Sequence, residues 1–114
     1  MDTQIPGSLH VSEEAIADIV GSAVMECYGV VGMTPADGEG LLSLLPSSRL
    51  RRGVRVSMAE GGVCIDLYVV IEFGTNIGVV SRNLADRVKF VLDEYAKIAV
   101  ATINVHVQDV KVRR

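Results

Sequence analysis

Aromatic residues are scarce in this sequence. They make up 4% of its 114 residues, and tryptophan is absent. The core must therefore be built from valine, isoleucine, leucine and alanine. Hydrophobic residues reach 49% and charged residues 22%, a balance typical of a globular rather than a disordered chain. A chain of this length buries roughly two-thirds of its unfolded surface, which suffices for one domain with an unassisted core.

Residues that could carry metal or catalytic chemistry are also few. The two cysteines, Cys27 and Cys64, form no CxxC pair and no cysteine–histidine cluster with zinc spacing. The two histidines, His10 and His106, stand alone, and no serine lies in a GxSxG motif. We therefore expect buried free thiols, no metal, no cofactor and no enzymatic activity.

The chain has neither a basic excess nor a long apolar run. Its formal net charge is −3, which argues against a general polyanion binder. No window reaches the roughly 18 apolar residues of a membrane-spanning helix, and the start of the chain lacks the basic and apolar regions of a signal peptide. We expect a cytoplasmic protein. Short basic groups remain as candidate anion contacts: Arg49, Arg51 and Arg52 in a loop, and Arg113 and Arg114, with Lys111, at the end.

The first half of the chain contains one clear helix signal. Residues 1–7 are interpreted as a tail and residues 8–11 as a short strand. Ser12 is placed to cap a following helix. Apolar residues recur at helical spacing after this cap: Ile16, Ile19, Val20, Ala23, Val24 and Cys27. Gly29 is the expected stop, and residues 30–32 are expected to form a buried turn.

The second half begins with the pattern of a β-hairpin. Residues 53–58 and 63–73 are strand-like, and a Glu-Gly pair lies between them. With that pair in the turn, Arg55 lies opposite Asp66 on one face, while apolar residues pair on the other. Because this register gives an oppositely charged pair on one face and apolar pairs on the other, the pattern favours it.

A second amphipathic helix and a last strand follow. Asn76 (or Thr75) is placed to cap the helix. Its apolar stripe consists of Ile77, Val80, Leu84, Val88, Val91, Leu92 and Tyr95. The strand covers residues 102–108, and its side chains alternate. Ile103, Val105 and Val107 are expected to face the core, and Thr102, Asn104, His106 and Gln108 to face outward.

The order of the expected elements is strand–helix–strand–strand–helix–strand. This βαββαβ order predicts an α+β fold, a two-layer sandwich in which two helices cover one face of a mainly antiparallel sheet. We assign residues 8–110 to a single domain, between the tail at 1–7 and a basic tail at 111–114.

Two surfaces remain as candidate contact sites. The expected outward face of the sheet carries Cys64, Asp66, Tyr68, Val70, Val100, Thr102, Asn104 and His106. This mixture is intermediate between a solvent-exposed face and an interface. An apolar segment before Pro46 is either a flap folded onto the core or an exposed contact patch. The candidate interaction surface consists of Leu41, Leu42, Leu44 and Leu45 from this segment, with Tyr68, Asn104 and His106.

Five short segments carry a family resemblance. They are GSLHVS at 7–12, YGVVGM at 28–33, GVRV at 53–56, IDLYVV at 65–70 and INVHV at 103–107. Together they resemble the bacterial alkaline-shock-protein family, the Gls-type envelope stress response proteins, over nearly the whole chain. Two positions depart from the family pattern. Ala85 stands where a glutamine is common, and Lys97 stands where a glycine is common after the second helix.

The resemblance implies a non-catalytic cytoplasmic adaptor or scaffold protein linked to cell-envelope stress. It also implies self-association into a homo-oligomer and docking to a membrane-anchored partner protein, with no cofactor. Two alternatives stay open. One is a small nucleic-acid-binding domain that uses the basic loop and tail, and salt-dependent binding would distinguish it. The other is a ligand-binding protein or enzyme with a site at Cys64, Asp66, Tyr68 and His106, which would need a deep pocket.

Overall fold

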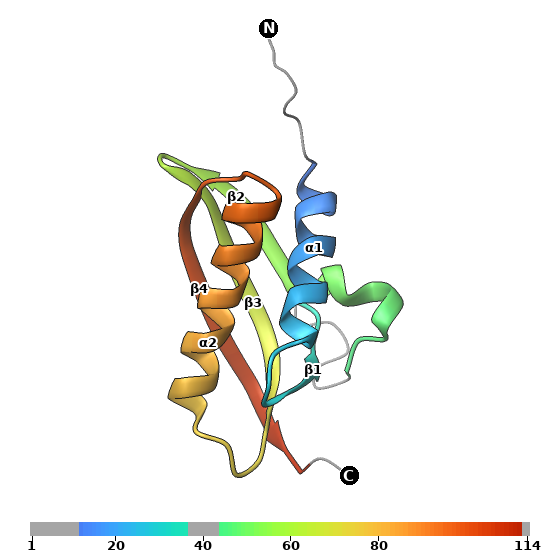
Figure 1. The fold of residues 1–114 in the computed structure, drawn as a ribbon. Coiled ribbons are helices and arrows are strands. Elements are labelled where there is room, and N and C mark those ends of the chain that lie inside the picture. Colours follow the sequence, from blue (N-terminus) through green and yellow to red (C-terminus); the bar gives the residue numbers. More distant parts are fainter. Residues whose placement is uncertain (1–11, 37–43, 113–114) are drawn as a thin grey trace, which may run out of the picture.

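Two helices and a four-stranded sheet form the described part of the chain (Figure 1). The structure is a computed structural model, and it describes residues 12–36 and 44–112. The predicted α+β class, with helices on one side of a sheet, is confirmed. The strand expected at residues 8–11 lies outside the described residues.

Helix α1 (Glu13–Met25) begins directly after Ser12, as the sequence predicts, but it ends before Cys27, which was expected on its apolar stripe. The hydroxyl of Ser12 accepts a hydrogen bond from the backbone amide three residues on, at 3.1 Å, and so caps the first turn. Gly29 follows the helix with φ +91°, and a Cβ added there would lie 2.7 Å from Cγ2 of Val80. Glycine fits this turn because it has no Cβ and adopts positive φ freely. The buried residues of α1 are Ile16, Ala17, Val20, Gly21, Ala23 and Val24.

A short strand, β1 (Val30–Met33), follows where only a buried turn was expected. It pairs antiparallel with residues 69–71 of β3 (Gly62–Glu72). Four residues that include Gly32 are too few to show the alternation of a strand. The pairing with a strand distant in the sequence determines their structure.

The central strand of the sheet is β3. Strand β2 (Val54–Ala59) pairs antiparallel with its first half and β1 with its second half, so β1 and β2 lie end to end along one edge of β3. Strand β4 (Val100–Lys111) pairs with the other edge, in parallel. Two of the three pairings are thus antiparallel, as expected, but the longest is parallel. A parallel neighbour needs a crossover, which the second helix provides.

The β2–β3 hairpin has the predicted register. Arg55 lies opposite Asp66, and Val54 lies opposite Leu67. The turn contains Gly61 with φ +96°. The segment that precedes β2 is a 3-10 helix, η1 (Ser47–Gly53).

Helix α2 (Ile77–Phe90) is capped by Asn76, whose Oδ1 accepts from the amide three residues on at 3.0 Å. The helix continues as one π-helical turn, η2 (Val91–Tyr95). The two ends of the expected stripe do not lie in the core. Ile77 is the first residue of α2 and is 43% exposed, and the buried stripe begins one turn later, at Val80. Tyr95 is 74% exposed, since the wider π turn rotates it out of the stripe.

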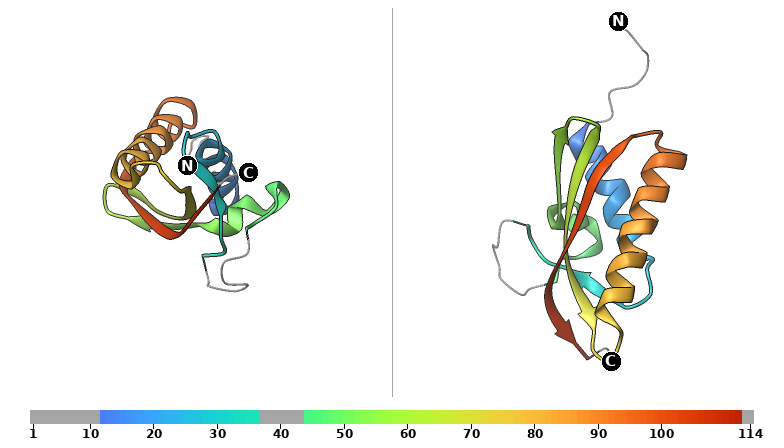
Figure 2. Two further views of the ribbon diagram at one scale, coloured as in Figure 1. Left: turned by 90° about the horizontal axis from the view of Figure 1, so that it is seen from below. Right: turned by 90° about the vertical axis from the view of Figure 1, so that its left-hand side faces the viewer.

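Both helices cover the same face of the sheet, and the core lies between these layers (Figure 2). Its fully buried side chains include Val20, Val24, Ile65, Leu67, Val69, Leu84, Val88 and Leu92. Ile103, Val105 and Val107 of β4 are half-buried and pack against this core, as predicted. We call the opposite side of the sheet the outer face.

Candidate functional site

Three side chains from two neighbouring strands form a hydrogen-bonded group on the outer face. Asp66 lies on β3, and Asn104 and His106 lie on β4 beside it. Oδ1 of Asp66 accepts a hydrogen bond from Nδ2 of Asn104 at 3.1 Å and lies 3.1 Å from Nε2 of His106. Since an ionised carboxylate only accepts hydrogen bonds, Nε2 of His106 carries a proton in this arrangement.

Tyr68 extends this group along β3. It pairs with His106 in the parallel ladder, and the two rings are stacked, with centroids 4.6 Å apart and planes inclined by 11°. The His106 side chain remains 41% exposed and that of Asp66 24% exposed. We call Asp66, Tyr68, Asn104 and His106 the outer-face cluster. Stacking and hydrogen bonding hold its rings in one orientation at the surface.

The charge of Asp66 is stabilised by its neighbours. The hydrogen bond with His106 is the largest cause that holds the pKa of Asp66 below its ordinary value. The hydrogen bond from Asn104 and the positive charge of Arg55 act in the same direction, whereas partial burial opposes them. Arg55 lies across the hairpin on β2, and its guanidinium donates to the carbonyl oxygen of Ala36 at 3.3 Å. The carboxylate is therefore ionised at neutral pH.

Two residues expected on the outer face are not exposed there. Val70 is fully buried, and the register of β4 shifts between its pairing and that of Val69. It pairs with Gly32, against which the side chain of Leu44 packs. Val100 is half-buried against the core, because a register shift before Cys64 leaves it on the inner side. The exposed outer face is consequently more polar than the sequence suggested.

The leucine segment is divided between core and surface. Leu41 and Leu42 lie outside the described residues. The amide of Leu45 donates to the carbonyl of Met33 at 2.8 Å, and its side chain packs against the core. Leu44 is 40% exposed, and its Cδ2 would lie 3.0 Å from a Cβ added at Gly32. The described part is thus a flap whose outer side chain remains accessible.

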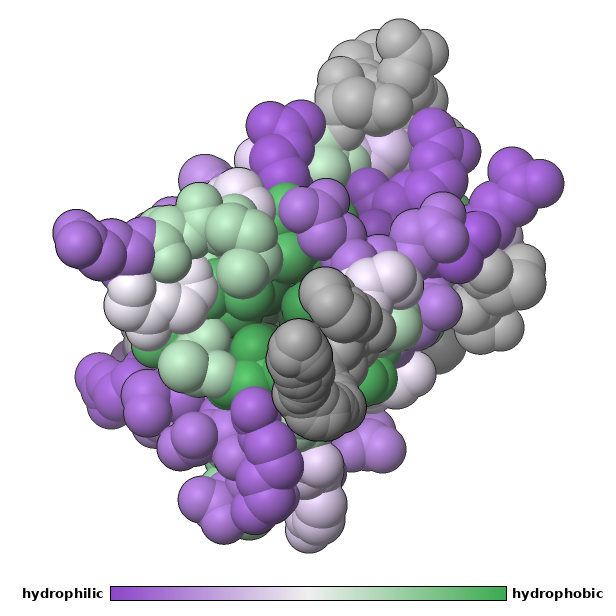
Figure 3. Space-filling view, turned by 90° about the horizontal axis from the view of Figure 1, so that it is seen from above, coloured by the Kyte–Doolittle hydropathy of each residue, from purple (hydrophilic) through white to green (hydrophobic). Residues whose placement is uncertain are grey.

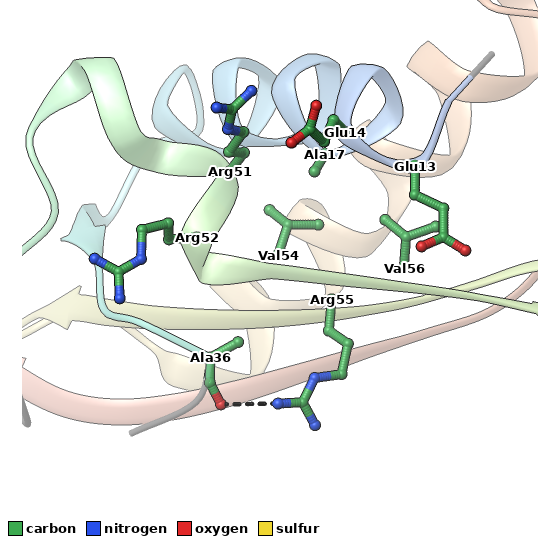
Figure 4. A pocket seen from close by; sticks show the side chains of 9 residues that line it. All are labelled: Glu13, Glu14, Ala17, Ala36, Arg51, Arg52, Val54, Arg55 and Val56. Carbon is green, nitrogen blue, oxygen red and sulfur yellow. Dashed lines mark hydrogen bonds between the residues drawn. The ribbon is translucent and has the colours of Figure 1, made fainter. Parts of the chain in front are cut away.

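The basic loop residues border a shallow hollow of about 340 Å³ between α1 and β2 (Figure 4). Its lining residues are Glu13, Glu14, Ala17, Ala36, Arg51, Arg52, Val54, Arg55 and Val56. The valines point toward α1, whereas Arg55 points to the other side of the strand. Nη1 of Arg51 lies 3.7 Å from Oδ2 of Asp18. Carboxylates therefore accompany the cations of this hollow. Arg49 is exposed on η1, and Arg113 and Arg114 lie outside the described residues.

A second groove, of about 500 Å³, runs between the helices. It is lined by Asp18, Ile19, Ser22, Ala23, Glu26, Arg87, Val91 and Tyr95. Nη2 of Arg87 donates to Oε1 of Glu26 at 2.8 Å, and this bond raises the pKa of the guanidinium. Tyr95 packs edge-to-face on Phe90, with ring centroids 5.7 Å apart. Sequence reasoning missed this groove, because no sequence signal marked the π turn that turns Tyr95 outward.

Apolar side chains also gather at the end of the molecule that carries the β2–β3 hairpin. In the view from that end, they occupy the middle of the surface and polar side chains surround them (Figure 3). Met58, in the hairpin, is 69% exposed. This end is a further apolar area of the described residues that the sequence did not reveal.

The described residues offer little for metal or redox chemistry. Among them, no group of three or more histidine, cysteine, aspartate or glutamate side chains could hold a metal ion. Cys27 and Cys64 are free and only half-buried, in contrast to the expected full burial. Burial is the main cause that raises the pKa of the Cys27 thiol. Along residues 12–36 and 44–112, no helix is long and apolar enough to cross a membrane.

Comparisons with known proteins point to one family. The model of the alkaline shock protein 23 family, described by a cell envelope-related function, matches residues 1–112. Uncharacterized protein YloU of Bacillus subtilis (strain 168) is 34% identical over 108 residues, which cover 93% of this chain and 90% of that protein. Uncharacterized protein Spy1614 of Streptococcus pyogenes serotype M6 is 35% identical over 108 residues, or 93% and 89% of the two chains. No solved structure matches the chain.

Proposed function

The chain belongs to the alkaline shock protein 23 family, whose function is cell envelope-related, and from this membership we propose that it is a non-catalytic adaptor. It acts by contact, through self-association and through docking to a membrane-linked partner. The protein resides in the cytoplasm, and the partner holds it at the membrane.

The observation that carries this proposal is the outer-face cluster. Its rings and hydrogen bonds are fixed on two paired strands, and Asp66, Tyr68 and His106 line neither of the two hollows described above. Such a group suits recognition of a surface, because an ordered side chain loses little conformational entropy when it is bound. Tyrosine, moreover, is enriched among the residues that dominate interface energies.

The flap residue Leu44 is a second observation that supports the same proposal. It is an accessible leucine next to β1, held by a backbone hydrogen bond of the following residue. Leucines exposed in this way contribute apolar area to a contact. We therefore assign Tyr68 and Leu44 as the two positions at which a charge should interfere with assembly.

The test introduces that charge at each position separately. Tyr68→Glu and Leu44→Glu are compared with Tyr28→Glu, a control at a tyrosine that is 82% exposed on another part of the molecule. At least one of the two test variants should weaken association, because a buried carboxylate without a partner is costly. Sedimentation velocity over a range of concentrations measures self-association, and co-sedimentation with the native membrane fraction measures docking. If both variants are folded and behave like the control, the proposal is wrong.

Nucleic-acid binding is the less favoured alternative. The hollow next to Arg51 and Arg52 also contains Glu13 and Glu14, which offset its positive charge. Binding of mixed oligonucleotides that weakens steeply with salt would favour this alternative over the adaptor.

A further inference from the structure

Strand β4 forms an open border of the sheet. Among the described residues it pairs only with β3, and it is the outermost strand on its side (Figure 2). Its 12 residues include no proline, and none is charged between Val100 and Gln108. Proteins usually protect such an edge with proline, lysine or a covering element, because its free backbone groups can pair with another strand. Within residues 12–36 and 44–112, this edge has none of those three protections over most of its length.

Two register shifts limit the part of the edge that is regular. At each shift β4 has one more residue than β3, and these two extra residues are Ala101 and Gln108. Residues 102–107 between them pair with β3 without interruption. Bulges bend and twist a strand, so the regular segment is the part available for pairing with a further strand.

This segment is complementary to itself. Asn104 and His106 point to the outer face, and Ile103, Val105 and Val107 lie on the core side. If two copies meet antiparallel about a two-fold axis at Val105, Asn104 of each lies opposite His106 of the other. Ile103 then lies opposite Val107 in the same way. Polar residues meet polar ones, apolar residues meet apolar ones, and no charge faces a like charge.

We propose that a second copy of this chain pairs with the β4 edge in this register, so that the two sheets become one continuous sheet. The inference rests on the proposed self-association and names its surface. A two-fold axis makes the contact isologous, with the same patch used on both copies. Since only five residues of each copy pair, the dimer is weak and depends on concentration.

Disulfide trapping tests the register directly. Cys27 and Cys64 are first replaced by alanine, and Asn104→Cys and His106→Cys are then made as separate proteins, one of them with a mass tag. Their equimolar mixture should yield severalfold more mixed disulfide than either protein yields alone. Asn83→Cys, at an exposed position of α2, gives the background from random collision.

A charge swap provides a second readout without new thiols. The double variant Asn104→Lys/His106→Lys places like charges opposite each other in the dimer, whereas Asn104→Lys/His106→Glu places opposite charges there. We expect the first to dissociate roughly tenfold more readily than the second in sedimentation. Equal dissociation constants would contradict the register.

The outcomes separate this inference from the proposed function. If the wild-type chain associates but mixed disulfides stay at the Asn83→Cys background, association uses another surface and only the edge pairing is wrong. Disulfides within Asn104→Cys alone, equal to those of the mixture, would also contradict the axis at Val105. If the wild-type chain is monomeric at every concentration and the mixture of the Asn104→Cys and His106→Cys proteins forms no disulfide above background, both self-association and edge pairing are wrong.

Discussion

Among single residues, Asp66 links the outer-face cluster to pH. Because its folded-state pKa is lower than its ordinary value, the native state favours the ionised carboxylate. Its contribution is fully present above the unfolded pKa, near 4, and is lost as pH falls through the folded pKa. We expect Asp66→Asn to cost about 1 kcal/mol at pH 7, since the hydrogen bonds are partly solvent-screened. Urea unfolding between pH 7 and pH 2 should show the gap between wild type and variant narrowing below about pH 4. A gap independent of pH would contradict this linkage.

Val24 and Val88 test the phases of the two helices. Both are fully buried, as the helical spacing predicted. Replacing either by alanine removes methyl groups from a packed site and should lower the free energy of unfolding by roughly 1–3 kcal/mol. Val79→Ala is the matched control, because Val79 lies on α2 but is 41% exposed. Chemical denaturation measures all three variants, and a control as destabilised as Val88→Ala would mean that burial is not the cause.

Local chemistry explains which residues could be placed from the sequence. Ser12 and Asn76 cap their helices as expected, because a cap depends only on residues three positions away. Tyr68 and His106 were selected as surface residues, but their stacking depends on the parallel register of β3 and β4. The sequence does not encode such a register locally, so the cluster could not be assembled from it.

Among the elements, the turn after η2 carries a residue in an unfavourable conformation. Lys97 has φ +58°, the left-handed region that suits glycine, and glycine is common there in the family that this sequence resembles. Lys97→Gly should therefore raise the free energy of unfolding by roughly 0.5–1 kcal/mol. Lys97→Ala removes the charge but keeps the strain, so it should give no comparable gain. Thermal and urea unfolding of the pair separate backbone strain from charge.

The elements also differ in how far the sequence predicts them. The β2–β3 register follows from alternation on both faces of a hairpin, and it is confirmed from Val54↔Leu67 to Ala59↔Gly62. Strand β1 and the π turn η2 were missed, since both depend on contacts with distant parts of the chain. The strand order of the sheet could not be predicted either, because no local sequence feature determines which edge of β3 pairs with β4.

At the scale of the whole molecule, the two faces and the border of the sheet have different roles. The helices occupy one face, the outer-face cluster lies on the other, and β4 leaves one edge open among the residues that the structure describes. Under the proposals made above, a second copy at the edge leaves the cluster of each copy accessible. Self-association and partner docking are then compatible within one assembly.

The end-to-end placement of β1 and β2 along β3 indicates where extra residues can be inserted into this chain. The ends of their connection are fixed independently, by 2.8 Å hydrogen bonds from the Ala36 amide to the Arg52 carbonyl and from the Leu45 amide to Met33. Extra residues between 36 and 44 would therefore shift neither strand. Since doubling a loop costs only about 0.6 kcal/mol, a glycine–serine insertion of about six residues after Gly38 should lower the free energy of unfolding by less than about 1 kcal/mol. The same insertion in the tight turn at Gly61 should lower the free energy of unfolding by more. Denaturation curves of the two variants will show whether the chain tolerates added residues between β1 and β2 better than in the hairpin turn.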